Sequence, residues 1–306
     1  MTEPSSFTQQ QFRVMGGPAS LTLRHIAPMR ERAEDACNEV RAELDRLEAK
    51  YSRYVEGSVI SEINRNAGSG TVTTVDDETR GLLHVCSRLH EQSDGLFDPT
   101  AGTLNTVWNL QSGQIDVPER LPTLLNRIGW HKVNISADGV YLPEATTSLD
   151  LGGVVKEYAV DLAVKLLRQR GFNDAIVELA GDVFASGTND HDMPWRIGVA
   201  DPSQPDKPVT TIELKDAALT SSGSYQRFFT HKGVRYSHFL NPKTGYPVAG
   251  AISVSVVGEN ALMAGAVATI ACLKGSESAK AWLLAADLPW LIINEFGQLE
   301  GPLANR

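Results

Sequence analysis

The sequence predicts an α+β protein in which mixed or antiparallel sheets carry flanking helices. Three observations support this class: short β-type runs separated by turn residues, longer segments with apolar residues at helical spacing, and no linker, repeat or charge block that divides the chain. A chain of 306 residues is long enough to bury one large core. We therefore expect a disordered start over residues 1–10 and one compact domain over residues 11–306.

The first third of the chain is expected to form a strand followed by helices. Residues 12–24 resemble a strand that is interrupted by glycines and a proline. Residues 28–50 and 76–91 have the spacing of helices. The apolar face of the first helix is expected to contain Ala33, Cys37, Val40, Leu44 and Leu47. Asp98 before Pro99 predicts an N-cap that opens a helix, which by itself explains an aspartate at this position.

The middle third reads as strands around one helix. A β-type run at 147–151 leads through Gly152 and Gly153 into a helical segment that Gly171 can end. Strand, paired glycines and helix aim free N–H groups at a phosphate, and Lys156 in the first turn adds a positive charge. Glycine pairs at such turns are common, and the dinucleotide fingerprint GxGxxG is missing. Further strands are expected at 140–142, 175–187 (with a turn at Gly181 and Asp182), 195–202, 208–214 and 217–222.

The last third contains a candidate site. Residues 221–247 read as a Ser-Ser-Gly turn, an aromatic strand, a Lys-Gly turn and a second strand that delivers His238 to a loop. A general base needs a neutral imidazole held at a fixed angle, and the loop around Asn241 and Thr244 could provide that support. The alternative is a half-buried, hydrogen-bonded strand histidine. After the hairpin we expect a strand at 252–257, helices at 261–273 and 276–287, a strand at 291–294 and a turn at Gly297.

Composition excludes several function classes. The net charge of −9 without a basic stripe argues against nucleic-acid binding. No apolar run approaches the ~20 residues that span a bilayer. The start of the chain has neither the basic nor the apolar region of a signal peptide. Three scattered cysteines, Cys37, Cys86 and Cys272, are expected to be reduced and buried, which predicts a cytoplasmic protein.

An ordered series of motifs resembles the ApbE-like flavin transferases. The motifs are Met15-Gly16, YSRY…SEIN at 51–64, GLFDPTAG at 95–102, DLGGVVKEYAVD at 150–161, LAGD at 179–182, SSGSYQR at 221–227, SHFLNPKTGYP at 237–247 and ALMAGAVATIACLKG at 261–275. The resemblance covers essentially residues 14–275, in order and at matching spacing. It predicts a single ApbE-like domain.

This resemblance implies an FAD:protein FMN transferase. Such an enzyme binds FAD, cleaves its pyrophosphate and attaches FMN to a Thr or Ser of an acceptor flavoprotein, with a divalent metal, usually Mg²⁺. By position, Tyr54 would stack on a ring of the nucleotide, Lys156 would sit near the phosphates and His238 would be the catalytic base or its close helper. The positions implied for cofactor binding are Met15, Tyr54, Ser58, Glu62, Asn64, Asp98, Gly152, Gly153, Lys156, Gly181, Asp182, Ser222, Asn241 and Thr244, and those implied for the metal are Thr269 and Gly153.

The chain departs from the family pattern at its catalytic end. The family usually has Asp where this chain has Asn241, and an Asp four residues before Thr269 where this chain has Gly265. Positions i and i+4 share a helical face, so Gly265 removes the charged ligand from that face and should weaken Mg²⁺ binding. The family's paired glycine is Ala180-Gly181 here. Glu157 replaces the glycine that usually follows the lysine, and it either adds a carboxylate near the phosphates or faces solvent.

Alternatives to the transferase remain open at this point. Loss of the metal aspartate leaves a non-catalytic FAD-binding protein or an FAD pyrophosphatase as alternatives, and outside the family an interaction domain. The chain contains no good copy of the family's acceptor motif, so modification of itself is not expected. Gly265→Asp is expected to rebuild a carboxylate and hydroxyl pair with Thr269 and, unless the site is tightly packed, to be nearly neutral for folding.

Overall fold

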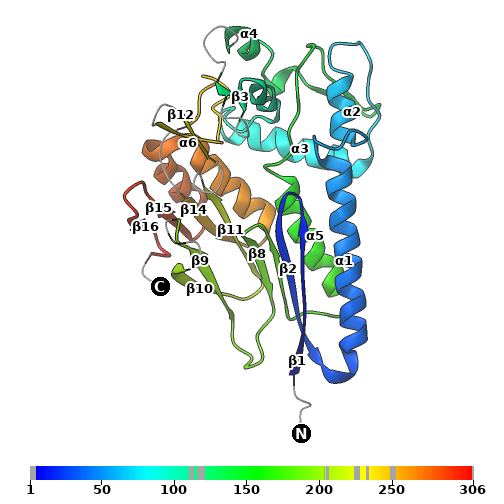
Figure 1. Ribbon diagram of the computed structural model, residues 1–306, viewed down its shortest axis with the longest axis vertical. Coiled ribbons are helices and arrows are strands. Elements are labelled where there is room, and N and C mark those ends of the chain that lie inside the picture. The colour runs from blue at the N-terminus through cyan, green and yellow to red at the C-terminus, as the bar shows by residue number, and fades with distance from the viewer. Residues whose placement is uncertain are drawn as a thin grey trace.

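An eight-stranded antiparallel sheet forms the centre of the molecule (Figure 1). The computed structural model describes residues 5–109, 114–115, 121–202, 204, 207–223, 228–231, 234–248 and 253–304. Among these residues the sheet has the strand order β1-β2-β7-β8-β11-β14-β15-β16. Its strands are β1 (Ser5–Val14), β2 (Gly17–Ile26), β7 (Ala175–Leu179), β8 (Asp182–Ser186), β11 (Ala217–Gly223), β14 (Ser253–Gly258), β15 (Trp290–Ile293) and β16 (Leu299–Glu300).

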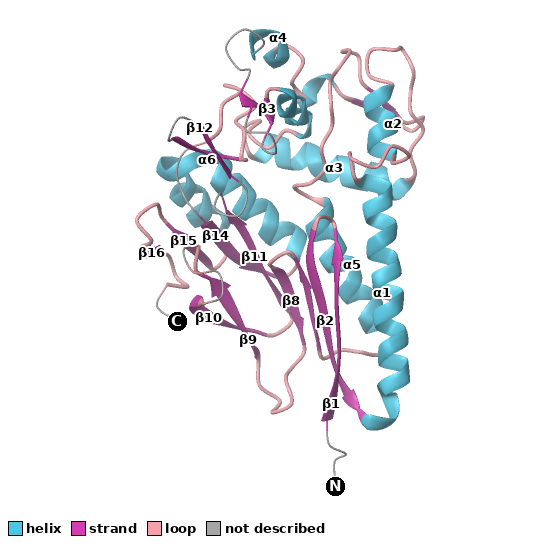
Figure 2. Ribbon diagram, in the orientation of Figure 1, coloured by secondary structure: helices cyan, strands magenta, loops and turns pink. Residues whose placement is uncertain are grey.

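Three long helices cover one face of this sheet and follow its strand order (Figure 2). Helix α1 (Arg30–Tyr51) packs on β1 and β2, α5 (Val155–Gln169) on β7 and β8, and α6 (Ala261–Ala286) on β11 and β14. Helix α5 lies between the other two and contacts both. The apolar side chains between this layer and the sheet form the largest core of the described residues. The fold is therefore the α+β class that the sequence predicts.

Smaller elements complete the fold. Strands β9 and β10 form a hairpin that shares a second apolar core with the opposite face of the sheet. Helices α2 and α3 and the 3₁₀ helix η2 lie beyond the end of the sheet where the β1–β2 turn is found (Figure 1). These and the remaining elements are η1 (Ala27–Met29), α2 (Val59–Arg65), α3 (Asp77–Gln92), η2 (Pro99–Thr106), β3 (Trp108–Asn109), β4 (Gln114–Ile115), α4 (Leu121–Leu125), η3 (Trp130–Lys132), β5 (Asn134–Ile135), β6 (Val140–Tyr141), β9 (Trp195–Ala200), β10 (Pro208–Leu214), β12 (Phe228–His231) and β13 (Val234–Ser237).

The start of the chain corrects the sequence prediction. Residues 5–10 belong to β1 and are not disordered; residues 1–4 lie outside the described part. The segment predicted as one interrupted strand is instead a hairpin of β1 and β2, joined at Met15 and Gly16. The side chains of β1 are mostly polar and do not indicate a strand. Its backbone groups are hydrogen-bonded because β1 pairs with β2 along ten residue pairs.

Two other predicted segments take a different form. No strand forms over 147–151, because side chains from Asn64 and Thr103 take up the backbone groups of this segment. Residues 221–223 are the end of strand β11 and not a turn. The hairpin that follows is confirmed, since β12 and β13 pair antiparallel, while its expected turn at 232–233 lies outside the described residues.

Helix α6 begins under a double cap and is interrupted once. Asn260 accepts a hydrogen bond from the backbone N–H of Met263, and Asp161 of α5 accepts from the two preceding N–H groups, those of Ala261 and Leu262. Gly275 is non-helical (φ 72°, ψ 175°), which is the break between the two helical segments that the sequence predicts. The contact from Asp161 fixes α6 relative to α5 at the end nearest the candidate site.

The predictions on thiols and membrane spans can be compared with the described residues. All three cysteines are free and buried, as predicted. In the described part of the chain, the helices lack the combination of length and apolar character that crossing a bilayer requires.

Candidate functional site

The candidate site lies at one end of the sheet, where two hairpin turns pack together. Met15 and Gly16 (φ 52° and 74°) connect β1 to β2, and Ala180 and Gly181 (φ 50° and 92°) connect β7 to β8. Positive φ at both central residues is the geometry of a type I′ turn. A β-carbon built on Gly17 would lie 2.5 Å from that of Ala180, so only glycine at position 17 lets the two turns approach.

Beside these turns, a buried ion pair joins α5 to the sheet. Lys156 Nζ donates a short hydrogen bond to Asp182 Oδ2, and the backbone N–H of Ser221 donates to Asp182 Oδ1 at 3.0 Å. Asp182 is 1 % exposed. Burial alone would lower the pKa of Lys156, but the charges of Glu157 and Asp182 outweigh it and raise that pKa above its ordinary value. The lysine is therefore a fixed positive charge in the first turn of α5.

Glu157 lies next to this pair and is unusual for a buried carboxyl. The residue is 4 % exposed, its Oε1 is 3.5 Å from Lys156 Nζ, and its Oε2 has no hydrogen-bond partner among the described residues. A β-carbon built on Gly265 would lie 2.5 Å from Cγ of Glu157. Burial raises the pKa of Glu157 well above its ordinary value, and the negative charge of Asp182 adds to the increase. Of the two readings offered by the sequence, the solvent-facing one is wrong.

A line of hydroxyl groups faces the same region from β11 and α6. Ser222 Oγ and Thr269 Oγ1 are 2.9 Å apart, which joins the strand to the helix one turn after Gly265. Thr220 lies two residues before Ser222 and so on the same face of β11. Its buried hydroxyl also has no partner among the described residues. Unpaired buried polar groups are uncommon in folded proteins, so the hydroxyl of Thr220 and the Oε2 atom of Glu157 each call for an explanation.

On the other side of the α5 N-terminus, an exposed aromatic ring is tied to the glycine turn. The ring of Tyr54 is 75 % exposed, and the Arg53 guanidinium lies 4.4 Å from its centre. Arg53 Nε forms an ion pair with Asp150 Oδ2 at 3.0 Å. Asp150 Oδ1 in turn accepts a hydrogen bond from the N–H of Gly152 at 2.8 Å. One chain of contacts therefore links the aromatic platform to the turn that opens α5.

Three other predicted positions, Ser58, Glu62 and Asn64, belong to α2 or its cap. Asn64 accepts from the N–H of Leu149 at 2.7 Å and donates to the carbonyl of the same residue at 3.0 Å. Ser58 caps α2 through the N–H of Ser61, and the side chain of Glu62 is exposed. Asn64 thus holds the segment that leads to Asp150 and the glycine turn.

Asp98 caps a helix, as the sequence predicts, although the helix is 3₁₀. Its side chain is 3 % exposed; Oδ1 accepts from the N–H and hydroxyl of Thr100, and Oδ2 accepts from the N–H of Trp130. Gly153 lies against the residue that precedes this cap, since an added β-carbon would be 3.0 Å from the ring of Phe97. Glycine at position 153 therefore permits close packing of Phe97 against the turn.

His238 lies just after β13, at the start of the predicted loop. Its ring packs on Phe239 with 4.1 Å between ring centres. In the loop, Asn241 Oδ1 accepts from the N–H groups of Lys243 and Thr244. The carbonyl of Gly245 accepts from the indole N–H of Trp108 at 2.6 Å. These bonds fix the shape of the loop that follows the histidine, as the sequence analysis expects of a site.

Arg53, Asp150 and Thr220 were missed by sequence reasoning. Asp150 could have been identified, because an aspartate two residues before a glycine commonly forms a turn in which its side chain accepts from the glycine N–H. Thr220 could not, because its neighbours come from other elements. The described residues contain no cluster of three or more His, Cys, Asp or Glu side chains that could hold a metal by themselves.

Comparisons with known proteins identify the family of this chain. The model of the ApbE family matches residues 15–291. The FAD:protein FMN transferase of Treponema pallidum is 32 % identical over 267 residues, which cover 81 % of this chain and 74 % of that protein. The corresponding protein of Vibrio cholerae is 28 % identical and covers 91 % of this chain and 86 % of its own length.

A solved structure gives the same result for the fold. The crystal structure of the ApbE protein of Thermotoga maritima superposes with a TM-score of 0.87 at 29 % identity, covering 97 % of both chains. The match of the family model extends from the β1–β2 turn to β15 and so includes every group of the site described above. This chain belongs to the ApbE family.

Proposed function

We propose that this protein is an FAD:protein FMN transferase that attaches FMN to a Thr or Ser of an acceptor protein. The observation that carries the proposal is the contact chain from Tyr54 through Arg53 and Asp150 to Gly152. It puts a flat aromatic surface and the N-terminus of α5 at a fixed separation. FAD has flat rings at both ends of a pyrophosphate, so this pairing suits it. Family membership and the names of the relatives support the same conclusion.

In this proposal the chain binds FAD through groups on both sides of α5. Tyr54 stacks on a ring, while Lys156 and the N–H groups after Gly152 bind pyrophosphate oxygens. The ion pair with Asp182 orients Lys156 and keeps it charged. The remaining positions named in the sequence analysis, including Met15, Ser222 and Thr244, stay proposals for the same pocket.

The chemical step transfers a phosphoryl group. The acceptor hydroxyl oxygen forms a bond to the phosphorus of the FMN half, and the bond from that phosphorus to the bridging oxygen breaks. AMP leaves with the bridging oxygen, and the hydroxyl proton passes to a base, for which we propose His238. The loop bonds of Asn241 hold the segment after this histidine in one shape.

The residues at the α5 N-terminus fit a divalent cation such as Mg²⁺. Thr269 and the backbone oxygens around Gly153 are neutral hard donors, and Glu157 Oε2, which has no hydrogen-bond partner among the described residues, is a further oxygen donor. When bound, such an ion would neutralise charge on the pyrophosphate oxygens. Because one or two carboxylates suffice for Mg²⁺ when phosphates complete its shell, the absence of a larger acidic cluster among the described residues does not argue against it.

The test is an incubation of the purified protein with FAD, Mg²⁺ and candidate acceptor proteins, followed by intact mass measurement. We expect one acceptor to gain the mass of one FMN unit and AMP to appear in equal amount. A parallel reaction without acceptor measures AMP and FMN by chromatography. Release of free FMN and AMP with no acceptor modified would indicate a pyrophosphatase, and FAD binding without either product would indicate a binding protein. Both results would contradict the proposal.

A further inference from the structure

We propose that Glu157 supplies the carboxylate that holds a divalent cation against the FAD pyrophosphate, in the space that Gly265 leaves free on α6. This inference rests on the proposed function, because the pyrophosphate provides the remaining oxygen ligands. It replaces the expectation that the cation site has lost its charged ligand. The carboxylate is present, but it projects from α5 rather than from α6.

The first support is the set of partners around Glu157. Asp182 has both oxygens engaged, one by Lys156 and one by the N–H of Ser221. Glu157 Oε1 lies 3.5 Å from Lys156 Nζ and the carboxyl also interacts with that of Asp182, but its Oε2 is buried without a hydrogen-bond partner among the described residues. A buried carboxylate oxygen without a donor is strongly unfavourable unless the carboxyl takes up a proton or a cation completes its surroundings.

The second support is the charge of the cluster. One ammonium group, that of Lys156, faces the two buried carboxyl groups of Glu157 and Asp182. The cluster therefore keeps one uncompensated negative charge when both carboxyl groups are ionised. A divalent cation would offset this charge and leave one positive charge for the phosphates. Thr220 adds a buried hydroxyl without a partner in the described part, on the β11 face that carries Ser222.

The third support is steric. A side chain at position 265 forces Glu157 to move, because the β-carbon would lie 2.5 Å from Cγ, in the middle of a buried side chain. The two positions therefore share one space, which can hold a carboxylate from α5 or from α6 but not from both. The site is therefore tightly packed, which is the condition under which Gly265→Asp is not expected to be neutral for folding.

The experiment measures how strongly Mg²⁺ increases FAD affinity, by fluorescence quenching in Mg²⁺ or in EDTA. A second readout is binding of Mn²⁺ to the FAD complex by electron paramagnetic resonance. The variants are Glu157→Gln, Glu157→Ala and the double variant Glu157→Ala/Gly265→Asp, which moves the carboxylate to α6. Glu39→Gln is the control, since it removes one carboxylate at the opposite end of α5, where Glu39 pairs with Arg170.

We expect Glu157→Gln and Glu157→Ala to bind FAD in EDTA as the wild type does, but to lose the Mg²⁺ enhancement and Mn²⁺ affinity by about tenfold or more. The double variant should regain both, and Glu39→Gln should keep both. Gly265→Asp alone should lower the melting temperature, because two side chains then compete for one space. Because glutamine has the shape of glutamate and removes a buried charge, Glu157→Gln should fold.

The outcomes separate this inference from the proposed function. A wild-type Mg²⁺ response that survives in Glu157→Gln overturns the role of Glu157 and leaves the transferase untouched. A wild type whose FAD affinity ignores Mg²⁺, or that binds no FAD, overturns it as well. If Glu157→Gln loses the Mg²⁺ response and the wild type transfers FMN to no acceptor, the result supports Glu157 as the cation ligand and contradicts the transferase proposal.

Discussion

An exposed tyrosine beside an ordered arginine is the residue from which ligand binding can be tested most directly. Tyr54 has 75 % of its surface exposed, yet Arg53 and Asp150 fix the position of its ring. We expect Tyr54→Ala to weaken FAD binding by about 1–3 kcal/mol, the range measured for stacking of a base on an aromatic side chain. Fluorescence titration with FAD measures the change.

The control for this variant is Phe296→Ala. Phe296 is 79 % exposed in the turn between β15 and β16, so it matches Tyr54 in exposure and lies on a different element. Its removal should leave FAD affinity unchanged. Equal affinity in the wild type and in a folded Tyr54→Ala protein would remove Tyr54 from the site.

His238 decides the catalytic half of the proposal. If His238 is the base, His238→Ala should lower the transfer rate by about 10²–10⁴-fold, the usual contribution of a general base, with FAD affinity and melting temperature nearly intact. Rates come from the time course of acceptor modification. His84→Ala, at an exposed position of α3, is the control. Full transfer by the His238 variant, or its failure to fold, would return this histidine to a structural role.

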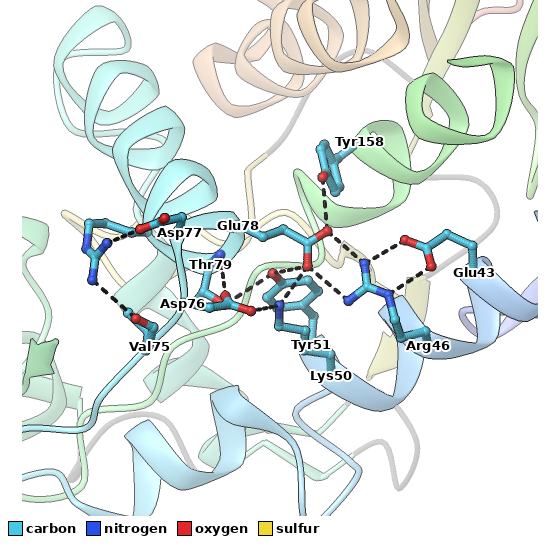
Figure 3. A network of polar contacts seen from close by, with 11 residues as sticks. Glu43, Arg46, Lys50, Tyr51, Val75, Asp76, Asp77, Glu78, Thr79 and Tyr158 are labelled. Atoms are coloured by element: carbon cyan, nitrogen blue, oxygen red, sulfur yellow. Dashed lines mark hydrogen bonds and ion pairs between the residues drawn. The ribbon is translucent and has the colours of Figure 1, made fainter. Parts of the chain in front are cut away.

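At the scale of elements, a charged network fastens three helices to one another (Figure 3). Glu78 of α3 accepts hydrogen bonds from Arg46 of α1 at 2.8 Å, from Lys50 of α1 at 2.6 Å and from the Tyr158 hydroxyl of α5 at 3.0 Å. Lys50 also bonds Asp76, the N-cap of α3, at 2.5 Å. The network therefore positions α3 and the start of α5 relative to α1.

This network predicts a loss of stability in acid. Burial alone would raise the pKa of Glu78, but hydrogen bonds from Arg46, Lys50 and Tyr158 outweigh it and lower the pKa from 4.5 to about 2. A carboxylate with a lowered pKa stabilises the fold above its ordinary pKa, and this contribution is lost as the pH falls toward the folded value. The free energy of unfolding should therefore decrease between pH 4.5 and about 2.

Glu78→Gln tests the assignment of this acid sensitivity. At neutral pH the variant should lose about 1.5–3 kcal/mol of stability, the contribution of hydrogen bonds to a charged group, measured by urea unfolding. Near pH 2 most of this difference should be lost, because about half of the wild-type carboxylate is then protonated, and the rest should disappear below that pH. Glu34→Gln, which removes an exposed pair with Arg30, should change little at either pH. A constant difference between Glu78→Gln and wild type at every pH would contradict this account.

At the scale of the whole molecule, the three cysteines report on global packing. Cys37, Cys86 and Cys272 lie in α1, α3 and α6, and all three are buried. Burial raises the pKa of Cys37 to about 11 and those of Cys86 and Cys272 to about 12. Because the thiolate is the reactive form, these thiols should be inert in the native protein.

We expect Ellman's reagent to label no thiol in the native state and three in denaturant. Labelling should become fast only where the protein unfolds globally, because each cysteine is buried on a different helix. Leu284→Cys, at an exposed position of α6, is the positive control and should react at once. Rapid reaction of one native cysteine would show that its helix opens separately from the rest.

Much of the fold could be predicted because its signals are local. The spacing of Ala33, Cys37 and Val40 predicts α1, and all three are buried. Asp98 before Pro99 predicts a cap, and Gly171 (φ 88°) follows the end of α5 as expected. Strand β1 could not be predicted this way, because its residues are mostly polar and do not alternate clearly with apolar ones. Its pairing with β2 stabilises it instead.

The motifs of the site could also be recognised in the sequence, although the contacts between residues of different motifs could not. Sequence order identified the glycine turn, Lys156 and the family, because each motif is a short run of neighbouring residues. The contacts Arg53–Asp150 and Ser222–Thr269 join residues from separate elements, so no local pattern contains them.

Glu157 and Gly265 show most clearly what each level decides. The sequence by itself determined that position 265 is a glycine and that a glutamate follows Lys156. When Gly265 is considered alone, the chain lacks the carboxylate that the family usually has at this position. Only the tertiary structure decided that both positions share one buried space. The physical reason is that the packing of α5 against α6 sets this distance, and such packing depends on the whole core rather than on the residues near either position.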